Sequence, residues 1–113
     1  MILTEQMIIP LDKLTNYLLI PQKQNDKSKY LAMAGFTQEN PLDLFNAIQE
    51  LAQNFELIED VTNEYGTFYR IEGTLRGVNQ FDLEVVTILL KQIIDEKYHF
   101  ITLKPKKGCR NVN

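Results

Sequence analysis

The sequence predicts an α+β domain in which three N-terminal helices pack on a four-stranded, mainly antiparallel sheet. Three observations predict it. Residues 81–90, FDLEVVTILL, first alternate apolar and polar side chains and then become apolar on both faces, which is typical of a strand near the middle of a sheet. The flanking stretches TFYRIEGTL and YHFITLKP are rich in β-branched and aromatic residues. Before residue 55, apolar residues instead recur at helical spacing.

The central strand has a helical alternative. Leu83, Val86 and Leu90 recur at spacings of three and four residues, and this pattern continues to Lys97. Residues 85–88, however, are β-branched in succession, and such side chains lose conformational freedom in a helix. We therefore place the central strand at about Phe81 to Leu90 and keep a helix over residues 83–97 as the alternative.

The first helix is predicted after Pro10, whose fixed φ suits the first helical turn and whose missing N–H group costs nothing there. Leu11, Leu14 and Leu18 form the apolar stripe that would face the core. Pro21 forbids the helix from continuing.

Two more helices are predicted before the sheet. Asp26 or Ser28 caps a short second helix, and Gly35 closes it in the left-handed conformation. Asn40 caps a third helix that begins with a proline and ends near Asn54.

The remaining strands follow in order along the chain. FELIEDV predicts an edge strand, and residues 65–75 alternate in the manner of a half-exposed strand. A turn over residues 76–80 joins that strand to the central one as a hairpin. The last strand, YHFITLK, stops at Pro105.

Length and composition favour a single domain over residues 1–113, with a flexible basic tail over about residues 106–113. The single cysteine, Cys109, predicts a reducing compartment, and no signal peptide or membrane-spanning run is evident, so we expect a cytoplasmic protein without membrane contact. The formal charge of −3 argues against a general polyanion binder. Basic residues near the C-terminus are nevertheless candidates for phosphate contacts: Lys104, Lys106, Lys107 and Arg110.

Strong catalytic motifs are absent: the sequence has no phosphate-binding glycine loop, no paired-histidine metal motif and no serine on a glycine elbow. We expect no metal and no cofactor. Cleavage of RNA needs neither, because a base, an acid and cations for the developing charge suffice. Lys29, Arg70 and His99, with Lys104 or Thr102 beside them, could supply those roles if they converge.

Two hydroxyls, Thr87 and Thr102, interrupt otherwise apolar strand sequences. Such residues are common in sheets, and we prefer that interpretation for both. A polar pocket around Thr87 is the alternative.

The succession IIPLDKLTNYLL, KSKYLAMAGFTQENPLDLFNAI, YGTFYRIEGTL and EVVTILL before FITLKP resembles the small bacterial domain of unknown function family 6883 over nearly the whole chain. The resemblance implies a lysine at the start of the second helix, matched by Lys29, and strand threonines matched by Thr87 and Thr102. Family arginines in the last two strands are replaced by Val86 and His99. The family is similar in layout to the nuclease tips of bacterial toxins of the barnase and RelE type.

Two hypotheses follow. The first is a non-catalytic binding module that uses a protein partner or self-association, because the balance of charge is acidic and the arginines that would clamp phosphate are replaced. An uncovered apolar sheet face would favour a dimer. The second is a metal-independent ribonuclease-like enzyme, with RNA as its partner, that uses Lys29, Arg70 and His99.

Overall fold

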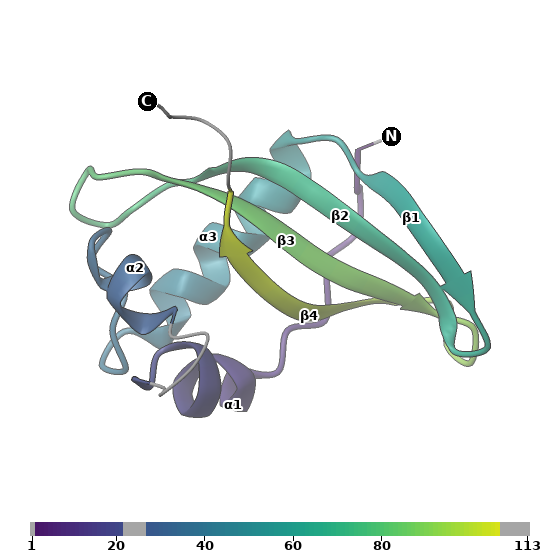
Figure 1. Ribbon diagram of the computed structural model, residues 1–113, viewed down its shortest axis with the longest axis horizontal. Helices are drawn as coiled ribbons and strands as arrows, with labels where there is room; N and C mark the ends of the chain where they lie inside the picture. Colours follow the sequence, from purple (N-terminus) through teal and green to yellow (C-terminus); the bar gives the residue numbers. More distant parts are fainter. Residues whose placement is uncertain (1, 22–26, 107–113) are drawn as a thin grey trace.

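The structure is a computed structural model that describes residues 2–21 and 27–106. Its C-terminal half forms one four-stranded antiparallel sheet in the order β1-β2-β3-β4 (Figure 1). The strands are β1 (Ile58–Asn63), β2 (Gly66–Leu75), β3 (Leu83–Gln92) and β4 (Tyr98–Pro105). Each strand therefore pairs with its neighbour in sequence.

β3 lies inside the sheet, so the helical alternative for this stretch is wrong. Thr87 pairs with Ile71 of β2 on one side and with Leu103 of β4 on the other. Leu83, Val85, Thr87 and Leu89 are buried on one face, whereas Val86 and Ile88 on the other face are half-buried. The paired backbone on both sides satisfies hydrogen bonds that a helix would have formed internally.

The expectation of three N-terminal helices is also wrong. The first stretch forms only one α-helical turn, α1 (Leu11–Lys13), and continues as a π-helix, η1 (Leu14–Leu18). There the N–H of Leu19 donates to the carbonyl of Leu14, five residues earlier, at 3.0 Å. The second, α2 (Ser28–Ala32), is a single short turn of helix. Leu14 and Leu18 are buried in η1, whereas Leu11 in α1 is exposed, so the predicted apolar stripe is only partly buried.

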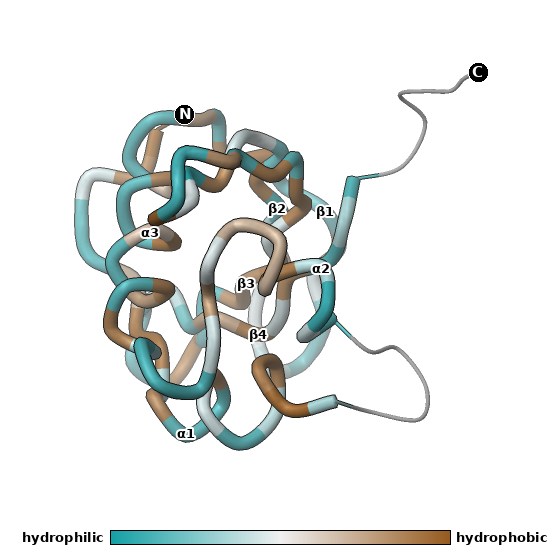
Figure 2. Tube along the Cα trace, turned by 90° about the vertical axis from the view of Figure 1, so that its left-hand side faces the viewer, coloured by the Kyte–Doolittle hydropathy of each residue, from teal (hydrophilic) through white to brown (hydrophobic). Residues whose placement is uncertain are grey.

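One full helix, α3 (Pro41–Asn54), lies in the middle of the chain and covers one face of the sheet (Figure 1). Figure 2 shows it to one side of the strands. Its buried residues Leu44, Ile48 and Leu51 meet the inward side chains of β2, β3 and β4, among them Ile71, Leu89 and Leu103. These apolar contacts form the core of the domain.

Residues 2–10 run from the region just before β1, where Ile2 forms a bridge with Glu56, to the edge of β4, where Ile8 forms a bridge with His99. The N–H of Ile8 donates to the carbonyl of Tyr98, and the N–H of Phe100 donates to the carbonyl of Ile8, both at 2.8 Å. This segment therefore covers part of an otherwise open sheet edge, which would attract another strand.

Candidate functional site

The face of the sheet that α3 leaves open carries several residues singled out from the sequence. Arg70 on β2 pairs with Ile88, which pairs in turn with Thr102 on β4, and His99 pairs with Leu90. Neighbouring strands lie about 4.8 Å apart, so the backbones of Arg70 and Thr102 are separated by roughly 10 Å. The sheet brings Arg70, His99 and Thr102 to one face without placing them in contact.

Arg70 is engaged by carboxylates. Its Nε lies 2.9 Å from Oε2 of Glu72, and its Nη1 lies 3.8 Å from Oδ2 of Asp60. Glu72 also binds Lys106, with 3.4 Å between Nζ and Oε1. Hydrogen bonds from Arg70 and Lys106 hold the pKa of Glu72 below its ordinary value. An incoming phosphate would compete with these carboxylates for the guanidinium.

His99 has a carboxylate partner of its own. Its Nε2 lies 2.7 Å from Oδ2 of Asp95, which belongs to the turn between β3 and β4. Asp95 also accepts the backbone N–H of Lys97 at 2.9 Å, and this bond is the first cause of its lowered pKa, with the His99 contact adding to it. This pair lies at the tip of the β3–β4 hairpin, whereas Arg70 is held toward β1.

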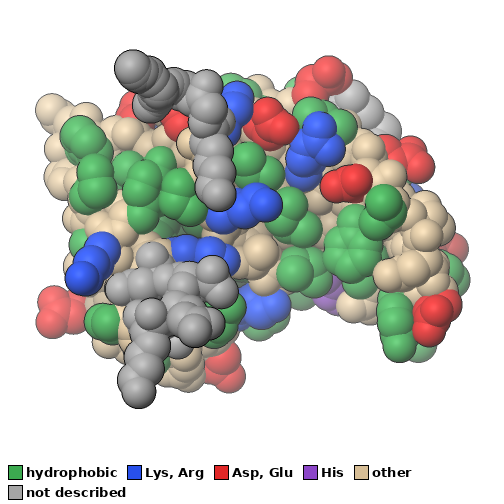
Figure 3. All heavy atoms as spheres, viewed as in Figure 1, with side chains coloured by type: hydrophobic (Ala, Val, Ile, Leu, Met, Phe, Trp, Pro, Cys, Tyr) green, Lys and Arg blue, Asp and Glu red, His purple; other side chains and the backbone are tan. Residues whose placement is uncertain are grey.

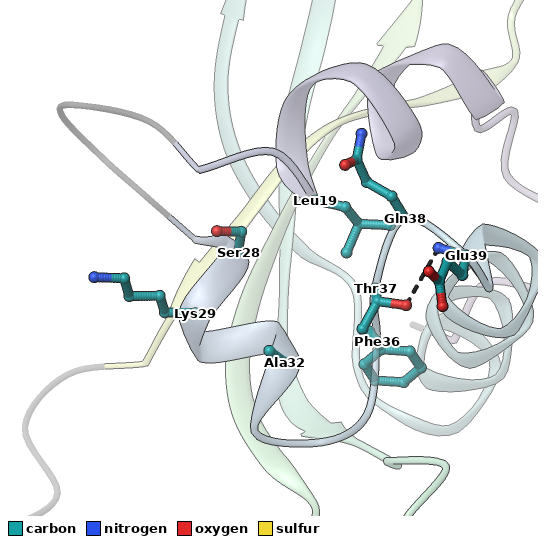
Figure 4. A pocket seen from close by; sticks show the side chains of 8 residues that line it. All are labelled: Leu19, Ser28, Lys29, Ala32, Phe36, Thr37, Gln38 and Glu39. Atoms are coloured by element: carbon teal, nitrogen blue, oxygen red, sulfur yellow. Dashed lines mark hydrogen bonds between the residues drawn. The ribbon is translucent and has the colours of Figure 1, made fainter.

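Lys29 lies elsewhere, on α2 at the margin of a pocket of about 350 Å³. Figure 4 shows Leu19, Phe36 and Thr37 lining this pocket while the side chain of Lys29 points away from them. The pocket is built from α2 and the following turn, where the N–H of Glu39 donates to Oγ1 of Thr37 at 3.2 Å. Neither Arg70 nor His99 lines it.

Thr87 lies in the core. Its exposed fraction is 0%, and among the described residues its Oγ1 has no hydrogen-bond partner. Its cross-strand neighbours Ile71 and Leu103 are apolar. Thr87 therefore occupies an ordinary core position, where burial of its hydroxyl lowers the free energy of unfolding.

Replacing Thr87 with valine is expected to raise the free energy of unfolding by about 1 kcal/mol, because the change removes a buried hydroxyl that makes no hydrogen bond. Urea denaturation of both proteins measures this difference. Thr4→Val, at an exposed position, is the control and should change stability little. A lower stability for Thr87→Val would show that the hydroxyl has a stabilising role.

Of the candidate phosphate contacts, Lys104 is exposed on β4 and Lys106 pairs with Glu72. Lys107 and Arg110 lie outside the described residues. The sequence did not single out Lys27, which approaches this region from the start of α2. Its Nζ donates to Oγ1 of Thr102 at 2.9 Å. Figure 3 shows basic side chains gathered in the middle of this face.

A second feature, also missed, is an apolar surface where the two hairpin turns meet. This hairpin-tip patch consists of Tyr65, Leu90, Ile93 and Ile94, which line a pocket of about 400 Å³ with Glu64 and Gln92. Tyr65 is 67% exposed, Ile93 62% and Ile94 89%. Asn, Asp and Gly are typical of turns, whereas these two isoleucines lie in a turn with most of their side-chain surface exposed.

The patch is held by backbone hydrogen bonds. The N–H of Ile93 donates to the carbonyl of Tyr65 at 3.0 Å and joins the two hairpins. Within the β3–β4 turn, the N–H of Glu96 donates to the carbonyl of Gln92 at 2.8 Å. These backbone hydrogen bonds fix the turn that carries the apolar side chains, and we call such a turn braced.

Three carboxylates lie in or beside the turns that carry the patch. Glu64 lines its pocket, and Asp95 and Glu96 continue the turn that carries Ile93 and Ile94. Figure 3 shows hydrophobic side chains with acidic ones beside them at this end of the molecule. A surface of this kind is suited to a protein with an apolar centre and a basic rim.

The signal for this patch was present in the sequence. Ile93 and Ile94 directly precede the polar residues Asp95, Glu96 and Lys97. Their apolar character suggested a continuing strand or helix, and only the pairing of Gln92 with Gly66 shows that the strand ends first.

A family model described as Domain of unknown function (DUF6883) matches residues 3–107. The chain belongs to this family. The resemblance inferred from the sequence is thus confirmed. No curated protein matches the chain.

Among solved structures, the DUF6883 domain is similar to a chain of a contact-dependent growth inhibition toxin–immunity protein complex from Klebsiella pneumoniae 342. The TM-score is 0.59 at 18% identity, and the match covers 90% of this chain and 95% of that chain. At this identity the likeness shows a shared fold.

Over residues 2–21 and 27–106, no helix has the length and apolar character needed to cross a membrane. In the same part of the chain, no three His, Cys, Asp or Glu side chains gather in a way that could hold a metal ion.

Proposed function

We propose that this DUF6883 domain is a non-catalytic module of the bacterial cytoplasm that binds another protein through the hairpin-tip patch. The observation that carries the proposal is the exposure of Ile93 and Ile94 on a braced turn. Exposed apolar surface with a polar rim marks interaction sites. The acidic rim favours a partner with basic side chains around its own apolar centre.

The fold comparison supports a role in protein binding. The similar chain belongs to a toxin–immunity protein complex, in which one protein binds another. The same fold is therefore compatible with assembly on a protein partner, and the family match leaves the partner open.

The ribonuclease-like alternative receives less support from the geometry. Lys29 lies at a pocket on α2, Arg70 is paired with Glu72 and Asp60, and His99 is paired with Asp95. Cleavage of a phosphodiester needs acid, base and cation within reach of one phosphate. Arg70 and His99 would have to leave separate carboxylate partners to meet, and Lys29 lies apart from both on α2.

The test begins with a tagged copy of the chain, which is used to isolate its partner from the organism that encodes it. The purified pair is then measured by isothermal titration calorimetry. Ile94→Glu is expected to weaken binding by about 100-fold, because a charge would be buried at the centre of the interface. Leu42→Glu is the matched control, since Leu42 is also exposed but lies at the start of α3.

Unchanged affinity of a variant with both Ile93 and Ile94 replaced by glutamate would contradict the proposed surface. Sedimentation of the chain alone distinguishes a second copy from a different protein as the partner. Cleavage of RNA by the purified chain, lost in His99→Ala, would contradict the non-catalytic role and favour the alternative.

A further inference from the structure

A pair of lysines, Lys27 and Lys104, lies on the open face of the sheet and shares no residue with the hairpin-tip patch. Lys27 Nζ donates to Thr102 Oγ1 at 2.9 Å, which joins the start of α2 to β4. Lys104 follows Thr102 by two residues and therefore points to the same face. The result is a cluster of two ammonium groups and one hydroxyl.

Neither lysine has a carboxylate partner among the described residues. The nearby Glu72 is already bound to Arg70 and Lys106, and Glu84 accepts a hydrogen bond from Thr74 at 2.7 Å. Lys27 is half-buried. Burial lowers the pKa of Lys27, and the positive charge of Lys104 lowers it further.

This arrangement is unfavourable for the chain alone. Lys27 is repelled by the positive charge of Lys104 and has lost part of its hydration, and within residues 2–21 and 27–106 it gains no negative partner. Ordinary surface lysines avoid this by extending into water. An anion between the two ammonium groups would remove the repulsion and satisfy their donors.

We propose that Lys27, Thr102 and Lys104 form a binding site for one phosphate group. The ammonium groups would each donate to a phosphate oxygen, and the hydroxyl of Thr102 would turn from the carbonyl of Leu103, now 3.4 Å away, to donate a third bond. The site is independent of the hairpin-tip patch and of the partner proposed for it.

The surroundings favour a small phosphate over a polyanion. Glu84 lies on the same face of the sheet as Lys104, since it stands two residues before Val86, the partner of Lys104. Its carboxylate would repel the further phosphates of an extended nucleic-acid strand. The formal charge of −3 also disfavours the binding of a polyanion.

The first measurement is the thermal midpoint of the purified chain in inorganic phosphate and in chloride at equal ionic strength and pH. Phosphate is expected to raise the midpoint in a saturable manner. Lys27→Met should reduce the apparent affinity by about tenfold or more, and Thr102→Val by a smaller factor. Lys97→Met, an exposed lysine at the β3–β4 turn, is the control and should behave as the wild type.

A second readout separates binding from folding. In chloride, Lys27→Met is expected to be at least as stable as the wild type, because it removes a half-buried charge that Lys104 repels. If Lys27→Met does not fold, Lys104→Met serves the same comparison. Equal midpoints in phosphate and chloride for the wild type, or an unchanged response of both lysine variants, would overturn the proposal.

A final experiment distinguishes a single phosphate group from the phosphates of a nucleic acid as the ligand. The titration is repeated with a ten-nucleotide single-stranded RNA at the same concentration of phosphate groups. A weaker response to RNA than to inorganic phosphate supports a site for a single group. A stronger response would overturn that assignment in favour of nucleic acid.

Discussion

Replacing Gly66 with valine is expected to lower the free energy of unfolding by about 3 kcal/mol or more. Gly66 has φ of 152°, where residues with a side chain are strained. A Cβ atom there would overlap the carbonyl oxygen of Lys91 on β3. Since that oxygen belongs to the backbone of a paired strand, it cannot move aside as a side chain could.

The measurement is chemical denaturation of the variant beside Glu64→Ala. Glu64 is an exposed residue in the same turn, so its loss should change stability by less than about 0.5 kcal/mol. Gly66 pairs with Gln92, and the neighbouring Tyr65 accepts the N–H of Ile93. A valine that left stability unchanged would mean that the two hairpins can separate freely, and the braced hairpin-tip patch would lose its structural basis.

The sheet could be predicted from sequence because its side-chain pattern repeats every two residues. Leu83, Val85 and Leu89 on β3 are buried as that alternation requires, and the register of β2 against β3 keeps their partners on the same face. The long helix was predicted for a similar reason, since Asn40 and Pro41 mark its start and its apolar stripe is regular.

The N-terminal part could not be predicted in the same way. The spacing of Leu11, Leu14 and Leu18 is helical, yet the chain forms one α turn and then a wider π turn. Nothing local dictates the wider turn. It depends on how the leucines meet α3 and the sheet, which is a property of the packed domain and not of the segment.

The candidate sites depend even more on tertiary structure. Lys27 and Thr102 are 75 residues apart in sequence, and their contact requires the start of α2 to reach β4. Lys29, two residues later, was singled out by the family resemblance and lies beside a different pocket. Residue type thus identified hydroxyls and cations, but only the fold determines which of them meet.

Replacing Gln49 with methionine is expected to cost about 3 kcal/mol of unfolding free energy, although the two side chains have similar volume. Gln49 is buried on α3, where its Oε1 accepts the N–H of Met7 at 3.0 Å and its Nε2 donates to the carbonyl of Met7 at 2.7 Å. Methionine would leave both backbone groups of Met7 buried and unpaired. Because Met7 precedes the residue that covers the edge of β4, the loss should also loosen that segment, which amide hydrogen exchange at Ile8 and Phe100 would detect.

Gln49→Glu separates the two hydrogen bonds. At neutral pH a carboxylate can accept the N–H of Met7 but faces its carbonyl oxygen without a proton to donate, so this variant should also be destabilised. Burial raises the pKa of such a carboxyl group, and the protonated form can donate to the carbonyl. The folded state then binds the proton more tightly than the unfolded state, so the stability difference from wild type should narrow as pH falls toward about 5. A difference that is constant with pH would contradict a role for the donated bond and would assign the cost of Gln49→Met to packing.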